Sequence, residues 1–97
     1  MTSRPVRART SSPRLHLWDE AVLYLAQLGR QHLWRLTVGV GWMELRDETT
    51  WIQLRFLPND QFAVRAGLEF ADEPTQEYTT DSYARALETV ERLATRA

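Results

Sequence analysis

Three arginines and a tryptophan fall at alternating positions of a stretch that the sequence predicts to be neighbouring strands. Arg35, Arg55 and Arg65 carry guanidinium groups, and Trp51 offers a flat apolar surface. Guanidinium groups bind carboxylates or phosphates, and flat rings stack on bases or side chains. The set therefore predicts recognition of a partner by one sheet face. With their odd-numbered neighbours, the predicted partner-binding residues are Arg35, Met43, Trp51, Gln53, Arg55 and Arg65.

The strands that must carry these residues are predicted by a period-2 pattern between Leu33 and Phe70. The apolar residues of this stretch fall on even numbers: Trp34, Leu36, Val38, Val40, Trp42, Ile52, Leu54, Phe56, Phe62, Val64, Ala66, Leu68 and Phe70. Such alternation is typical of a sheet with one buried face. We therefore expect Trp42 in the core and Met43 on the open face, in three strands.

The turns between these strands can be tested by parity, because residues directly opposite in an antiparallel pair share a face. A three-residue turn at Pro58-Asn59-Asp60 places Phe56 opposite Phe62, so core meets core. A three-residue loop at Arg46-Asp47-Glu48 preserves parity in the preceding hairpin, whereas a two-residue loop does not. We therefore predict a loop of three or five residues there.

Two amphipathic helices are predicted to flank the strands. Ser12 suits an N-cap and Pro13 the first helical position, and apolar residues at spacings of three and four run from there to Gly29, the predicted stop. A second such pattern runs from Thr80 or Asp81 to about Thr95. The polar residues 71–80 are predicted to form a loop. The predicted fold is α+β, a helix, a three-stranded antiparallel meander and a second helix, with both helices on one face of the sheet.

Several kinds of chemistry lack candidate residues. His16 and His32 lie about a helix length apart and cannot hold a metal together, and the chain has no cysteine. The glycines of Val38-Gly39-Val40-Gly41 lie inside a predicted strand and do not open a helix, as a dinucleotide-binding loop must. We therefore expect no enzyme activity, with no catalytic residue, no cofactor or small-molecule substrate, and no metal.

Charge is distributed unevenly along the 97 residues. The first fourteen contain Arg4, Arg7, Arg9 and Arg14 and no acid, whereas residues 15–97 contain eight arginines and thirteen acids. Residues 1–12 are predicted to be a flexible basic arm before a single domain at 13–97, and the four early arginines are candidate phosphate ligands. No apolar run is long enough for a membrane span, and the lack of cysteine favours the cytoplasm.

The predicted order of helix, three strands and helix over residues 13–97 is similar to that of double-stranded-RNA-binding domains, in topology only. That resemblance implies phosphate binding by a lysine-rich start of the second helix, yet Glu77 to Arg85 is acidic and has no lysine. Our first hypothesis is a non-enzymatic interaction module, an inhibitor or adaptor that meets a protein partner or itself through the open sheet face or an edge. The alternative is nucleic-acid binding by the arm and the sheet arginines.

Overall fold

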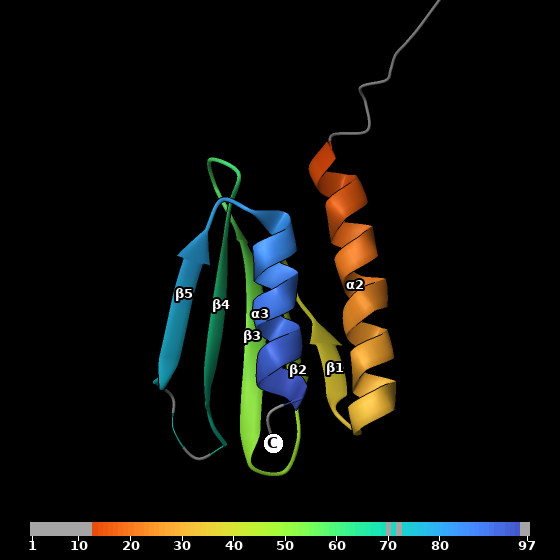
Figure 1. Cartoon of the computed structure of the whole chain (residues 1–97), viewed down its shortest axis with the longest axis vertical. Coiled ribbons are helices and arrows are strands. Elements are labelled where there is room, and N and C mark those ends of the chain that lie inside the picture. The colour runs from red at the N-terminus through yellow and green to blue at the C-terminus, as the bar shows by residue number, and fades with distance from the viewer. Residues whose placement is uncertain (1–12, 70, 72, 96–97) are drawn as a thin grey trace, which may run out of the picture.

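A computed structural model describes residues 13–69, 71 and 73–95 of the chain. It consists of two helices and one antiparallel sheet of five strands that pair in chain order. The elements, labelled in Figure 1, are α2 (Pro13–His32), β1 (Arg35–Val38), β2 (Trp42–Arg46), β3 (Thr50–Leu57), β4 (Gln61–Leu68), β5 (Gln76–Thr80) and α3 (Tyr83–Thr95). Neither described helix is long and apolar enough to cross a membrane.

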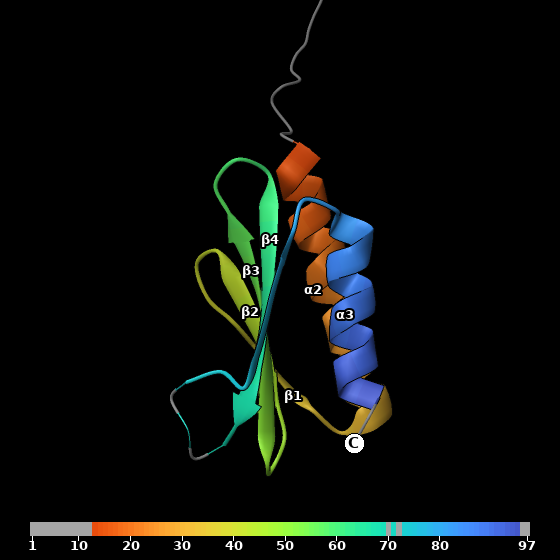
Figure 2. The ribbon, with the colours of Figure 1, turned by 60° about the vertical axis from the view of Figure 1, so that its left-hand side comes forward.

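The predicted α+β class is confirmed, and so is the placement of both helices on one face of the sheet. Figure 2 shows α2 and α3 together on the same side of the strands. α2 contacts β1 and β2, α3 contacts β3, β4 and β5, and the two helices contact each other. The predicted number of strands was wrong, because the sheet has five strands and not three. Two features of the chain account for the difference.

The first feature is a tight turn inside the segment predicted to be one long strand. β1 and β2 form a hairpin in which Val38 lies opposite Met43, and the Gly39 N–H donates to the carbonyl of Trp42 at 2.9 Å. Gly41 adopts a φ of 79°, which glycine tolerates because it has no Cβ. Since four residues separate Val38 from Met43, an even-numbered residue now faces an odd-numbered one. The core positions therefore change from even numbers in β1 to odd numbers in β2.

This phase change corrects two sequence predictions. Met43, predicted on the open face, is 0% exposed and lies in the core with Leu45. Trp42, predicted in the core, lies opposite Arg55 on the other face and is only half-buried. Three residues, 47–49, lie between the ends of β2 and β3, but the predicted register was wrong, because Arg46 pairs with Trp51 and an even number of residues lies between those two. An even number is the one that matches odd core positions in β2 to even core positions in β3.

Asp47 holds the turn between β2 and β3 together. Its Oδ1 accepts hydrogen bonds from the backbone N–H groups of Thr49 (2.9 Å) and Thr50 (2.8 Å) and from the Thr50 hydroxyl (3.0 Å). Burial raises the pKa of Asp47, but the hydrogen bonds from Thr49 and Thr50 outweigh it and leave that pKa below its usual value. The loop is thus an Asx turn, a structure for which aspartate is well suited.

The hairpin between β3 and β4 has the predicted register. Phe56 pairs with Phe62, and Trp51 pairs with Gly67. The three-residue turn is Pro58-Asn59-Asp60, in which Asn59 and Asp60 have positive φ values of 63° and 59°. Asn and Asp tolerate this conformation better than other residues with a Cβ.

The second feature is β5, which lies in the stretch predicted to be a loop. It pairs with β4 from Ala66 opposite Gln76 to Phe62 opposite Thr80. Three of its five residues are exposed and none is buried, so its sequence lacks apolar alternation. An edge strand needs only one paired side and few buried contacts, which is why the hydrophobic pattern did not reveal it.

Helix α2 runs past Gly29, the predicted stop, and ends at His32. The next residue, Leu33, has a φ of 63°, and the Trp34 N–H donates to the Gly29 carbonyl at 2.9 Å. This is the bond of a Schellman motif, with leucine at the position usually taken by glycine. Gly29 has a different role, because a Cβ there would lie 2.7 Å from the Trp34 carbonyl oxygen.

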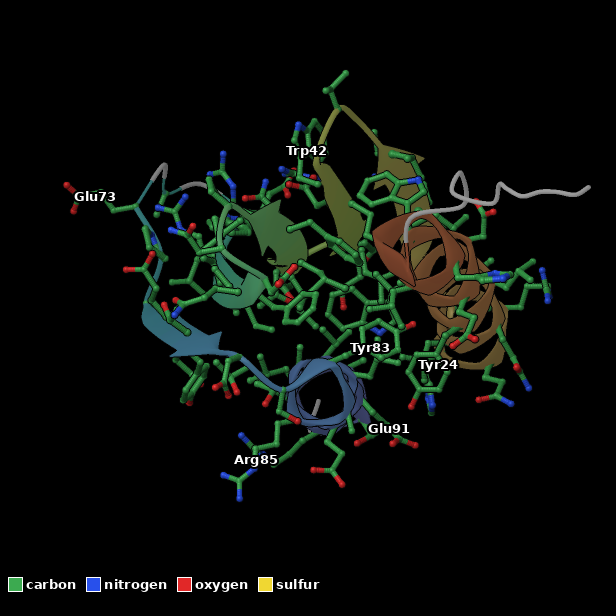
Figure 3. The ribbon with its side chains drawn as sticks, turned by 90° about the horizontal axis from the view of Figure 1, so that it is seen from above. Tyr24, Trp42, Glu73, Tyr83, Arg85 and Glu91 are labelled. Atoms are coloured by element: carbon green, nitrogen blue, oxygen red, sulfur yellow. The ribbon has the colours of Figure 1, made fainter. Side chains whose placement is uncertain are left out.

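The core lies between the sheet and the two helices. At one end four aromatic rings from both helices and two strands pack in sequence: Trp18, Phe56, Phe62 and Tyr83. The Tyr83 hydroxyl donates to the Leu17 carbonyl at 3.0 Å and so joins the helices. On the outer side of the helix pair, burial and a hydrogen bond to Glu91 raise the pKa of Tyr24 to about 12 (Figure 3).

The phase change at the first hairpin predicts which β2 side chain stabilises the fold more. Met43→Ala removes a fully buried side chain and should lower the free energy of unfolding by about 2–5 kcal/mol. Trp42→Ala should cost less, although tryptophan is larger, because its side chain lies on the open face and is partly exposed. Urea denaturation of both variants measures the order, and a larger loss for Trp42→Ala would contradict the assignment of the faces.

The end of α2 predicts a stabilising substitution. Leu33 is 86% exposed and adopts a left-handed backbone that costs leucine about 1–2 kcal/mol. Leu33→Gly removes that cost but frees the unfolded chain, so we expect a net gain of up to about 1 kcal/mol in a thermal or urea melt. Gly29→Ala is the control, because its Cβ meets the Trp34 carbonyl and should destabilise. A loss of stability in Leu33→Gly would refute this account.

Candidate functional site

The sheet face opposite the helices is the candidate site, and we call it the open face. The strand registers place one set of side chains there: Arg35, Thr37, Trp42, Glu44, Arg46, Trp51, Gln53, Arg55, Ala63, Arg65, Glu77 and Thr79, with Gly39 and Gly67 between them. Figure 3 shows Trp42 on the side of the molecule away from α3. No described element covers this face (Figure 2).

Each tryptophan of the open face lies over a glycine. A Cβ on Gly39 would come within 2.2 Å of the Trp42 ring, and a Cβ on Gly67 would come within 2.6 Å of the Trp51 ring. Only glycine leaves the space for these rings to lie against the backbone. The two indoles are therefore held flat on the sheet, one on β2 and the other on β3.

Of the two tryptophans, Trp51 is the one that is buried and hydrogen-bonded within the chain. It is 7% exposed, and its Nε1–H lies 3.1 Å from the Leu68 carbonyl and 3.4 Å from the Ala71 carbonyl. These contacts attach the start of the β4–β5 connection to the sheet. A buried indole with its N–H satisfied contributes packing and local order rather than a free binding surface.

A polar depression of about 310 Å³ lies beside Trp51 on the open face. Its lining is mostly charged and amide side chains: Glu44, Arg46, Trp51, Gln53, Arg55, Arg65, Glu69 and Ala71. Arg46 lies at the centre of an ion-pair network, with Nε 3.1 Å from Glu44 Oε2 and Nη1 2.5 Å from Glu69 Oε1. The hydrogen bond to Glu44, followed by that to Glu69, raises the pKa of Arg46. Both lining carboxylates are thus already bound to one guanidinium.

Arg65 is compensated less completely. Its Nε lies 3.1 Å from Oε2 of Glu77, its neighbour on β5. That Nε is buried and has no aligned hydrogen-bond partner, so the contact is an ion pair without a good hydrogen bond. The Arg65 charge is nonetheless offset within the chain.

Arg55 differs from these two arginines. Among the described residues no ion pair or hydrogen bond engages its side chain, which lies between Trp42 on β2 and Ala63 on β4. Trp42 is partly exposed and lies directly opposite Arg55. Arg35 on the edge strand β1 also has no ion pair among the described residues, but it lies opposite Arg46 and not opposite a tryptophan. Arg55 is thus an uncompensated guanidinium beside a partly exposed indole, and we call this pair the Trp42–Arg55 site.

The structure brings together four of the six predicted partner-binding residues. Trp51, Gln53, Arg55 and Arg65 line the polar depression. Arg35 lies on the same face but lines a separate hollow of about 580 Å³ with His32 and Leu33, and Met43 is buried on the opposite face. The candidate phosphate ligands Arg4, Arg7 and Arg9 lie outside the described residues, as does the side chain of Arg14.

Sequence reasoning missed four residues that shape the site: Trp42, Glu44, Arg46 and Glu69. Trp42, Glu44 and Arg46 are assigned to the open face if the chain turns at Gly41 and a new strand begins at Trp42. The closely spaced Gly39 and Gly41 were the available signal for that turn. Glu69 could not be found in this way, because it approaches Arg46 from a connection and not from a strand.

The depression on the open face offers guanidinium, carboxylate, amide and indole groups. The described residues lining the depression include no histidine or hydroxyl nucleophile. Within the described part of the chain no group of three histidine, cysteine or acidic residues is placed to hold a metal ion. No family model, curated protein or solved structure matches the chain.

The position of Trp51 predicts a link between the indole and the β4–β5 connection. Trp51→Phe removes the hydrogen bonds to the Leu68 and Ala71 carbonyls and part of the ring, so it should destabilise by about 1–3 kcal/mol. Hydrogen exchange should accelerate at Ala71, whose N–H donates to the Leu68 carbonyl. Gly67→Ala is the matched variant, because its added Cβ pushes the Trp51 ring out of place while the tryptophan itself is retained. Unchanged stability in both variants would show that Trp51 does not hold this connection.

Proposed function

We propose that the chain is a non-enzymatic protein-interaction module, of the adaptor or inhibitor type, that receives another protein on its open face. The observation that carries the proposal is the Trp42–Arg55 site, an uncompensated arginine beside an accessible tryptophan on an uncovered sheet. Arg and Trp are the residue types most enriched at the energetic centres of protein interfaces. The site provides a charged hydrogen-bond donor with five N–H groups and an apolar surface next to it.

The contrast among the arginines supports a specific role for Arg55. The same sheet compensates Arg46 with two carboxylates and Arg65 with one. A guanidinium left without an internal acid keeps its bonding capacity for an acidic or carbonyl group of a partner. We infer that Arg55 meets such a group while Trp42 contributes apolar contact.

A protein fits this face better than a nucleic acid does. Affinity for nucleic acid comes mainly from several cations that neutralise successive phosphates. Here Glu44, Glu69 and Glu77 lie among the arginines and would repel a phosphate chain. The nucleic-acid alternative therefore depends on the arginines of residues 1–14 and not on the described sheet.

Charge reversal at Arg55 tests the proposal. Arg55→Glu should weaken partner binding at least about tenfold, since it removes a charged hydrogen bond of roughly 1.5–3 kcal/mol. The free energy of unfolding should change by only about 0.5 kcal/mol, as for ordinary surface substitutions. The control is Arg85→Glu, an exposed arginine of α3 that points away from the sheet (Figure 3).

The measurement is affinity purification of tagged wild-type and variant chains from the native cell, with quantification of the bound proteins before and after nuclease treatment. We expect a set of proteins retained by wild type and Arg85→Glu and lost from Arg55→Glu. Retention of all partners by Arg55→Glu refutes the role of the Trp42–Arg55 site. Loss of all partners after nuclease treatment supports the nucleic-acid alternative instead.

A further inference from the structure

β5 is a sheet edge that no other described element covers. It pairs with β4 alone, and its central residues Glu77, Tyr78 and Thr79 are exposed, with Tyr78 at 40%. In Figure 1 no element lies beyond β5, and α3 lies on the inner side of it. The opposite edge differs, because α2 contacts β1 and runs alongside it. Uncovered strand edges are templates for pairing with another strand.

The hydrogen-bond alternation identifies the backbone groups that β5 directs outward. The Phe56 N–H donates to the Gly41 carbonyl at 2.9 Å, so even-numbered residues of β3 bond to β2. Because adjacent residues of a strand bond to opposite sides, odd-numbered residues of β3 bond to β4, and even-numbered residues of β4 bond to β5. In the register of β4 with β5, Val64 opposes Tyr78. Glu77 and Thr79 therefore direct their N–H and C=O groups away from the sheet.

We propose that β5 pairs antiparallel with β5 of a second copy of this chain, about a two-fold axis that passes beside Tyr78. In this arrangement Glu77 exchanges both backbone hydrogen bonds with Thr79 of the second copy, and Thr79 does the same with Glu77. The N–H and C=O groups of these four residues, two from each copy, are thereby hydrogen-bonded across the axis. The two Tyr78 rings become a cross-strand aromatic pair on the helix side, a favourable combination in antiparallel sheets.

Charge selects this register over its neighbours. A two-fold axis normal to the sheet keeps the same face of both copies on the same side. The register can then change only in steps of two residues, because only those steps keep outward N–H and C=O groups opposite each other. An axis at Glu77 would place two Glu77 side chains opposite each other, and an axis at Thr79 would place Glu77 opposite Asp81. Like charges in direct opposition destabilise a strand pair. With the axis at Tyr78, Glu77 faces Thr79, and its own carboxylate already lies 3.1 Å from Arg65.

The two copies fit without a collision of their helices. α3 contacts β3, β4 and β5 and leaves β5 as the outermost strand in Figure 1, so each helix lies on the inner side of its own edge. The pairing joins the two sheets into one and keeps both open faces on the same side. Because the interface is a single pair of short strands, its area is at the small end for specific contacts and the dimer is weak and concentration-dependent.

Opposite charge substitutions at Thr79 test the pairing and its register. Thr79→Lys places a lysine opposite Glu77 of the second copy, twice per dimer, and Thr79→Glu places two acids in opposition. We expect the dimer dissociation constant to fall about two- to thirtyfold in the first variant and to rise by a similar factor in the second. Sedimentation of the full chain over a hundredfold range up to about 1 mM measures both. Thr37→Lys and Thr37→Glu are the controls, because Thr37 is an exposed threonine on the opposite edge strand.

Thr79→Pro provides a second test that leaves the monomer intact. The N–H that this substitution removes points away from the sheet and does not bond to β4. Proline is tolerated on edge strands at such positions. The variant should sediment as a monomer at every concentration with its unfolding transition preserved. In wild-type chain, raising the concentration should slow hydrogen exchange at Glu77 and Thr79. A monomeric wild type up to about 1 mM, a dimer that survives Thr79→Pro, or equal effects of the two Thr79 charges would each overturn the proposal.

Discussion

The two-sided character of the sheet depends on the phase of the backbone at Gly39-Val40-Gly41. The positive φ of Gly41 closes an even-length turn, after which the inward positions of β2 are Met43 and Leu45. The Asx turn at Asp47, also of even length, then restores even-numbered core positions in β3. Because opposite residues must share a face, the two even-length turns together make the core positions odd in β2 and even in β3 and β4. One conformationally free residue thus decides which side chains of β2 meet the helices and which meet solvent.

The open face combines side chains that are bonded within the chain with side chains that are not, on the neighbouring strands β2 and β3. Trp51 over Gly67 and the network around Arg46 use the internal bonding capacity of that part of the sheet. The Trp42–Arg55 site lacks such internal partners in the described part of the chain. Natural sheets that leave a face in water usually cover it with self-compensating polar side chains. Arg35 and Arg55 have no internal acid in the described part of the chain, and only Arg55 lies directly opposite a tryptophan, which is why the functional proposal is placed on that pair and not on the whole arginine set.

Much of the fold follows from the sequence, and the failures have physical causes. The register of β3 with β4 was predicted correctly because Phe56, Phe62 and the Pro58-Asn59-Asp60 turn agree in parity and turn chemistry. Trp42 and Met43 were exchanged because five alternating apolar residues continue through the glycine turn and conceal it. β5 was missed because its neighbours in space, and not its own apolar pattern, make it a strand. At the site, Arg55 and Trp51 were found from their parity alone, but ion pairing distinguishes Arg55 from Arg46 and Arg65, and alternation carries no information about it.

The strand order also has a kinetic consequence. Because β1 to β5 pair strictly with their neighbours along the chain, most backbone pairing requires the closure of short loops only. Folding rates rise as the mean sequence separation of contacts falls, so this sheet belongs with the faster β-containing topologies. The contact that spans the chain is the one between the helices, where Tyr83 bonds to the Leu17 carbonyl. The entropic cost of bringing the two ends together therefore falls on the docking of α2 against α3, a step that a preformed meander can guide.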